Sequence, residues 1–73
     1  MKNDPFNVAV GAALRERRHD LELTQRDVAV LAKLSPNYVA RLERGELGPS
    51  LRVANALCRA LGVTIDNILP EAA

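Results

Sequence analysis

The chain has 73 residues, enough for one domain with one small hydrophobic core. Its formal net charge is only +1, so bulk charge gives no sign of a nucleic-acid partner. The single cysteine cannot form an internal disulfide, no apolar run reaches the about 20 residues of a membrane span, and no signal-peptide pattern opens the chain. We therefore expect a soluble cytoplasmic protein with no membrane partner, built as one domain over residues 1–73 with its core at about 8–69.

Local signals divide the chain into short helices and leave no candidate for a strand. Asp4 followed by Pro5 is typical of a helix start, Ser50 and Thr64 can cap two later helices, and Pro70 stops the last one. Helices are expected over residues 6–20, 25–33, 36–44, 51–61 and 65–69. The predicted fold class is therefore all-α, a five-helix domain with an aliphatic core.

The middle of the chain predicts two helices joined by a tight turn. Thr24 can cap the first, with Asp27 at the spacing of a capping box. Ser35 can cap the second, and Pro36 then occupies the first helical position, where its missing N–H costs nothing. Gly45 can take the left-handed conformation that ends a helix. This pattern indicates a helix-turn-helix.

The first of these two helices is expected to turn Val28, Leu31 and Ala32 towards the core. Lys33 then makes the turn with Leu34. Most such turns contain glycine, and this one has none. A residue with a side chain must therefore tolerate the backbone strain of the turn here.

An arginine shares the inward stripe of the first helix. Arg18 recurs at helical spacing with Val10, Leu14 and Leu21, so it should point into the protein, where a cation needs a carboxylate. Glu43 lies on the inward half of the helix over 36–44. We therefore expect an ion pair between Arg18 and Glu43 that holds the first and third helices together.

A series of short motifs runs along the chain in a fixed order. Its members are Leu23-Thr24-Gln25, Ala29, Ser35, Val39, Leu42-Glu43-Arg44-Gly45, Pro49-Ser50-Leu51 and Ala60-Leu61-Gly62-Val63. In this order and spacing they resemble the signature of the lambda-repressor-like (Cro/cI, XRE-type) helix-turn-helix family, over about residues 10–69. Glu22 and Lys33 replace residues that are often glycine. Pro36 and Tyr38 are unusual in the recognition helix, so no relative supplies the DNA sequence that is read.

The resemblance implies a DNA-binding domain that acts as a dimer. The helix over 36–44 would enter the major groove, and the helix over 25–33 would lie across the DNA backbone. Gln25 matches a family glutamine that contacts a phosphate and helps to fix the recognition helix. Arg44 matches a position that reaches the backbone, and Arg18 with Glu43 matches the buried ion pair of the family.

Chemistry suggests what each outward side chain reads. Arg41 can pair with guanine O6 and N7, Asn37 can pair with adenine, and Pro36 and Ala40 can contact a thymine methyl. Simple solvation is the alternative for Asn37 and Arg41, and packing against the core is the alternative for Tyr38. The predicted phosphate contacts are Gln25, Arg26, Tyr38, Arg44, Arg15 and Arg52.

A single copy would read too few base pairs to be specific. Two copies related by a two-fold axis would bind half-sites about one DNA turn apart. The apolar residues expected at the dimer interface are Leu47, Ile65, Ile68 and Leu69.

The main hypothesis is a sequence-specific DNA-binding transcriptional regulator, a repressor or autoregulator, that binds double-stranded DNA with a palindromic operator as a homodimer. No small-molecule effector is expected, so control would come from protein concentration. The alternative is a protein-interaction module of the same fold, such as an antitoxin, a restriction–modification controller or an antagonist of another regulator. Exposed Val30 and the apolar C-terminal residues favour that alternative, with RNA polymerase or a second regulatory protein as partner.

An enzyme is not expected. The sequence has no Ser/His/Asp or Cys/His set, no phosphate-binding loop and no metal-ligand cluster. Cys58 falls on the inward stripe of the helix over 51–61 and is expected to be a small buried apolar residue. No catalytic residue, cofactor or metal is therefore predicted.

Overall fold

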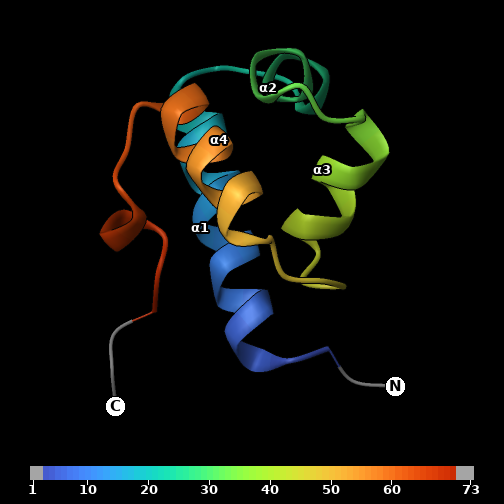
Figure 1. Ribbon diagram of the computed structural model, residues 1–73, viewed down its shortest axis with the longest axis vertical. Helices are drawn as coiled ribbons and strands as arrows, with labels where there is room; N and C mark the ends of the chain where they lie inside the picture. The colour runs from blue at the N-terminus through green and yellow to red at the C-terminus, as the bar shows by residue number, and fades with distance from the viewer. Residues whose placement is uncertain (1–2, 71–73) are drawn as a thin grey trace.

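The computed structural model describes residues 3–70 and contains four α-helices followed by one short 3-10 helix (Figure 1). The elements are α1 (Pro5–Asp20), α2 (Gln25–Ala32), α3 (Pro36–Glu43), α4 (Leu51–Leu61) and η1 (Ile65–Asn67). Residues 3–70 contain no strand, which agrees with the all-α prediction. None of these helices is long and apolar enough to cross a membrane.

The prediction of a fifth α-helix over 65–69 was wrong, because only the 3-10 turn η1 forms there. The backbone N–H of Thr64 donates to the side chain of Asn67 at 2.9 Å, and the N–H of Ile68 donates to the carbonyl of Ile65 at 3.1 Å. Pro70, three residues after η1, has no N–H with which to continue a helix. The segment is therefore too short for a ladder of α-helical hydrogen bonds.

The starts of the four α-helices confirm the predicted caps, whereas the Thr64 side chain accepts no backbone N–H at the start of η1. The Asp4 carboxylate accepts from the N–H two residues later at 2.8 Å, and the Ser35 and Ser50 hydroxyls accept from the N–H three residues later at 3.1 and 3.2 Å. Thr24 and Asp27 form the capping box, with reciprocal bonds of 3.0 and 2.8 Å. Each cap satisfies backbone donors that a helix start would otherwise leave unpaired.

All four α-helices end in the same left-handed turn. The residues with positive φ are Glu22 (56°), Lys33 (59°), Gly45 (75°) and Gly62 (66°). After α2, for example, the N–H of Leu34 returns to the carbonyl of Ala29 at 2.8 Å, as in a Schellman motif. Two of the four turns therefore place a side chain where glycine is favoured, as expected for Lys33. The helices α2 and α3 end one residue earlier than predicted.

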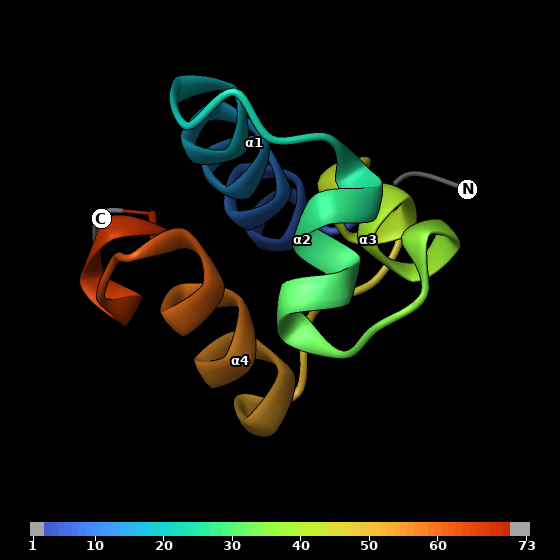
Figure 2. The ribbon, with the colours of Figure 1, turned by 90° about the horizontal axis from the view of Figure 1, so that it is seen from above.

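The core lies where α1, α2, α3 and α4 meet. Viewed from above, α2 lies between α3 and α4 (Figure 2), and α1 packs against α3. Gly11 makes the α1–α3 contact possible, since a Cβ at this position would lie 2.2 Å from the carbonyl oxygen of Leu42. The buried core residues are Val10, Leu14, Val28, Ala29, Ala32, Val39, Leu42, Leu57, Cys58, Leu61 and Ile68.

Two residues predicted to point inward are exposed. Leu31 is 57% exposed because α2 buries the stripe of Val28, Ala29 and Ala32 instead. Leu21 is 39% exposed because α1 ends before it, so the helical spacing no longer applies.

Candidate nucleic-acid interface

Helix α3 has one buried and one exposed face, as predicted. Val39 and Leu42 are 2% and 1% exposed and fix the helix against the core. The predicted base-contacting residues Pro36, Asn37 and Arg41 are exposed. Ala40 is half-buried beside them. The helix therefore presents a polar and cationic strip on a rigid support.

The buried face of α3 is held by Arg18. Its Nε donates to Glu43 Oε2 at 2.7 Å, and its Nη2 donates to Glu43 Oε1 at 2.9 Å, which confirms the predicted pair. The Nη1 of Arg18 donates to the carbonyl of Leu23 at 2.9 Å. The hydrogen bond to Glu43 also raises the pKa of Arg18 above its usual value. One guanidinium thus joins α1, α3 and the loop that leads into α2.

Gln25 completes this network from the start of α2. Its side-chain Nε2 donates to Glu43 Oε1 at 3.1 Å, and the residue is half-buried. An amide nitrogen carries two hydrogens, so one remains free to donate outward. Gln25 therefore fixes α2 against α3, while its predicted phosphate contact remains a prediction.

On the exposed side, the turn after α3 contains a residue that the sequence reasoning missed, Glu46. Arg41 Nε donates to Glu46 Oε1 at 3.2 Å, and Arg44 Nε donates to Glu46 Oε2. The hydrogen bond from Arg44 lowers the pKa of Glu46 most, and the hydrogen bond from Arg41 lowers it further. The signal that could have found Glu46 is Gly45, because a left-handed turn brings the next residue back towards Arg41.

The other predicted phosphate contacts come from three helices. Arg15 on α1, Arg26 on α2 and Arg52 on α4 are exposed, and none of them forms an ion pair within residues 3–70. Tyr38 is half-buried and packs against the core, so its ring has a structural role whether or not its hydroxyl meets a phosphate.

The predicted dimer residues divide into two groups. Ile65 and Leu69 are 39% and 42% exposed, whereas Ile68 is 2% exposed and Leu47 is half-buried against the core. The prediction for Ile68 is therefore corrected, because its side chain is already part of the core of this chain. Sequence reasoning missed Leu51, which is 84% exposed at the start of α4.

A shallow apolar groove connects these exposed residues. It has a volume of about 340 Å³ and lies between the start of α1, the loop before α4, and η1. Its lining includes Phe6, Leu51, Ile65 and Leu69. We call Leu51, Ile65 and Leu69 the apolar patch.

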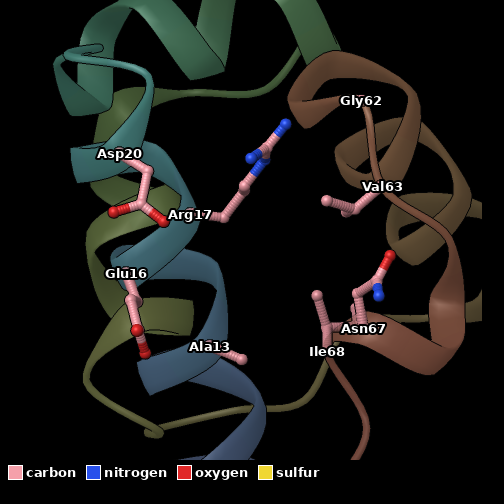
Figure 3. A pocket seen from close by; sticks show the side chains of 8 residues that line it. All are labelled: Ala13, Glu16, Arg17, Asp20, Gly62, Val63, Asn67 and Ile68. Carbon is pink, nitrogen blue, oxygen red and sulfur yellow. The ribbon is translucent and has the colours of Figure 1, made fainter.

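A second cleft, of about 470 Å³, separates α1 from the segment after α4 (Figure 3). Arg17 extends across it and donates from Nε to the carbonyl of Leu61 at 3.0 Å, which satisfies a carbonyl at the end of α4. The acidic residues Glu16 and Asp20 also line it. None of the residues predicted to contact DNA lines this cleft.

Cys58 is buried, and burial raises the pKa of its thiol, which disfavours the nucleophilic thiolate. Residues 3–70 contain no group of three histidine, cysteine or acidic side chains arranged to hold a metal ion.

A family model for the helix-turn-helix domain matches residues 9–69. The chain belongs to the helix-turn-helix family of XRE/cI type. The HTH-type transcriptional regulator DdrOP3 of Deinococcus deserti is 38% identical over 56 residues, which cover 77% of this chain and 43% of that protein. The chain spans about half the length of the curated relatives it matches.

Two solved structures of this family share the fold closely. The restriction–modification controller protein C.AhdI from Aeromonas hydrophila superposes with a TM-score of 0.83 at 33% identity, covering 86% of this chain and 96% of that one. The P22 c2 repressor, solved in complex with a synthetic operator, has a TM-score of 0.79 at 28% identity, covering 82% and 91%. The chain therefore shares the helix-turn-helix fold of a restriction–modification controller protein and of a repressor solved on operator DNA.

Proposed function

We propose that this protein is a DNA-binding transcriptional regulator, which binds a palindromic operator as a homodimer with α3 in the major groove and acts as a repressor or autoregulator. The observation that carries the proposal is the exposed strip of Pro36, Asn37 and Arg41 on a helix whose opposite face is locked by Glu43. A reading surface needs such a support, because base contacts depend on side chains held within a fraction of an ångström of the productive geometry.

Each exposed side chain of α3 has a partner of matching chemistry. Arg41 supplies a planar fork for guanine O6 and N7, Asn37 supplies an amide for adenine N6 and N7, and Pro36 and Ala40 supply apolar contacts to a thymine methyl. Base contacts of this kind carry the sequence information.

The surrounding polar groups supply orientation on the duplex. Gln25 stands at the start of α2, where the helix dipole favours an anion, and Tyr38 and Arg44 lie on α3 and directly after it. The exposed cations Arg26, Arg15 and Arg52 extend the surface that can meet phosphates.

The apolar patch is the proposed dimer contact. Leu51 leaves 84% of its surface exposed beside Ile65 and Leu69, and a second copy of the chain would bury it. Leu47, in the loop before α4, is half-buried against the core and stays a predicted contact of the dimer. A Leu51→Glu variant should shift sedimentation equilibrium from dimer to monomer, whereas exposed Leu31→Glu should not.

The decisive experiment is selection of bound duplexes from a random pool with the purified protein. A palindromic consensus with half-sites about one turn apart is expected. Arg41→Ala should lose discrimination at one base pair of each half-site, worth about 1–3 kcal/mol. Arg59→Ala, an equal charge change on α4, should keep it. An unchanged base preference in Arg41→Ala would reject the role of Arg41, and affinity independent of salt would reject DNA binding.

A protein partner is a second candidate function, supported by two adjacent exposed aliphatic side chains on α2. Val30 and Leu31 are 71% and 57% exposed. RNA polymerase or a second regulatory protein would cover them. A Val30→Ser, Leu31→Ser double variant should then bind the operator normally but lose its effect on a reporter promoter. Normal regulation by this variant would remove the candidate.

A further inference from the structure

The backbone after α3 fixes the position of Glu46. Gly45 adopts a φ of 75°, its N–H donates to the carbonyl of Leu42 at 3.0 Å, and the N–H of Glu46 returns to the carbonyl of Arg41 at 3.1 Å. This is the complete Schellman pattern. Gly45 is also buried against α1, where a Cβ would lie 2.7 Å from the Cα of Val8. The turn therefore has little freedom to move Glu46 away from Arg41.

The Glu46 carboxylate joins two arginines through one nitrogen each. Its two oxygens accept from the Nε of Arg41 and the Nε of Arg44. Within residues 3–70 the terminal Nη nitrogens of both arginines have no hydrogen-bond partner. The three side chains keep 46%, 58% and 34% of their surfaces exposed in the order Arg41, Arg44, Glu46, so the Nη groups can reach a ligand.

We propose that Glu46 is a specificity-determining positioning residue, which holds Arg41 by Nε and thereby directs its Nη1 and Nη2 end-on towards guanine O6 and N7. This rests on the proposed function. Nε is one of the two donors with which an arginine can approach guanine sideways. With Nε occupied, only the end-on approach remains, so the carboxylate selects one orientation of the fork.

The carboxylate also makes phosphates poorer ligands for the same arginines. Two arginines and one glutamate have a combined charge of +1 instead of +2, and any phosphate close to both arginines lies close to the carboxylate as well. Guanine O6 and N7 belong to a neutral base and meet less repulsion. Glu46 therefore weakens sequence-independent binding more than it weakens base recognition, which raises the ratio of the two affinities.

The test compares Glu46→Gln with Glu16→Gln. Both variants remove one negative charge, but Glu16 is exposed on α1 beside the cleft of Figure 3 and has no place in the proposed interface. Affinities are measured for the operator selected with the unchanged protein and for a scrambled duplex of equal length. Glu46→Gln should bind the scrambled duplex about 3-fold more tightly, with a salt slope steeper by about one unit. Its preference for the operator should fall about 10-fold.

A second measurement examines the positioning without DNA. In nuclear magnetic resonance spectra of the free protein, the Nε–H signals of Arg41 and Arg44 should be protected from exchange. Glu46→Gln should reduce the protection, because its one neutral carbonyl oxygen replaces the two charged oxygens that accept from the two arginines. Glu16→Gln should change neither these signals nor the operator preference. The proposal is overturned if both variants change the two affinities by the same factor, since Glu46 would then act only through net charge. A protein that selects no operator at all would instead reject the proposed function, and this proposal with it.

Discussion

Arginine and glutamate form an ion pair on each side of α3, and the two ion pairs differ in burial. The Arg18 and Glu43 side chains are 10% and 5% exposed, whereas those of Arg41 and Glu46 are 46% and 34% exposed. A buried charge without its partner is costly, so the inner pair must stay intact while the protein is folded. An exposed pair contributes little to stability and stays within reach of ligands. The inner pair therefore determines where α3 lies, and the outer cluster determines what it can bind.

Breaking the inner pair should have the largest effect on stability. Glu43→Ala leaves the Arg18 cation buried and also removes the acceptor of Gln25. We expect a loss of about 3–5 kcal/mol in the free energy of unfolding, measured by urea denaturation. Glu46→Ala, the matched change in the outer cluster, should leave the unfolding midpoint nearly unchanged.

The double variant Arg18→Met, Glu43→Leu separates the cost of an isolated charge from the value of the pair. Because apolar residues of similar size can replace a buried pair, it should be markedly more stable than Glu43→Ala. Equal losses in the two variants would mean that packing at this site, and not the unpaired cation, explains the destabilisation.

The contact between α1 and α3 is the next point at which the inner pair can be disturbed. In Gly11→Ala the added methyl would lie 2.2 Å from the carbonyl of Leu42 and 2.8 Å from that of Glu43, so the two helices must separate. We expect a loss of about 1–3 kcal/mol, seen as a lower melting temperature.

Gly48→Ala is the control for this change. There the new Cβ would meet Asn7 Oδ1 at 2.6 Å, the end of a side chain that can rotate away. Its melting temperature should change much less than that of Gly11→Ala. A similar fall in both variants would show that the clash at α1–α3 is relieved as easily as the one at Asn7.

The sequence predicted the inner pair but not the outer cluster, and the reason is periodicity. Arg18 and Glu43 both lie inside regular helices, where spacing fixes direction. Glu46 lies beyond the left-handed turn at Gly45, where helical spacing has ended. The same limit explains Leu21, which follows the last residue of α1.

Caps were predictable because they depend on a few neighbouring residues, as at Thr24 and Asp27. The burial of single apolar residues was not predictable in this way. Leu31 and Leu51 are exposed and Ile68 is buried, because which apolar side chains fill a small core depends on how the helices cross. The short turn η1 was also not predictable. A Thr at the cap position, followed by two apolar residues three positions apart, does not guarantee an α-helix.

A stabilising change would allow the inner pair to be studied in folded protein. Lys33 has a φ of 59°, a conformation that costs an L-residue about 1–2 kcal/mol and glycine almost nothing. Lys33→Gly should therefore raise the free energy of unfolding by about 0.5–1 kcal/mol, after allowing for the greater flexibility of glycine when unfolded. Urea denaturation measures the gain.

Lys33→Ala is the matched control, because alanine keeps the Cβ and hence the strain. It should show no such gain. A stabilisation of both variants would assign the effect to loss of the lysine charge and not to the left-handed backbone.

The smallest expected effect is the pH dependence of stability that Glu46 contributes in the outer cluster. Its arginines lower the pKa of Glu46, so the folded state favours the ionised carboxylate. The stability that this provides is present above the usual glutamate pKa of about 4.3 and is lost as pH falls through the lower pKa of the folded state. Melting temperatures of the unchanged protein and of Glu46→Gln should therefore differ slightly at pH 6 and should converge as the pH falls and Glu46 is protonated.

Asp27 also makes the folded state less stable at low pH, because hydrogen bonds from Thr24 lower its pKa as well. Glu46→Gln should retain that part of the acid sensitivity, and a combined Glu46→Gln, Asp27→Asn variant should lose more of it. Glu16→Gln should follow the unchanged protein at every pH. If Glu46→Gln does so too, the arginines release Glu46 in solution, and the outer cluster would then lack the order that directs Arg41 towards a base.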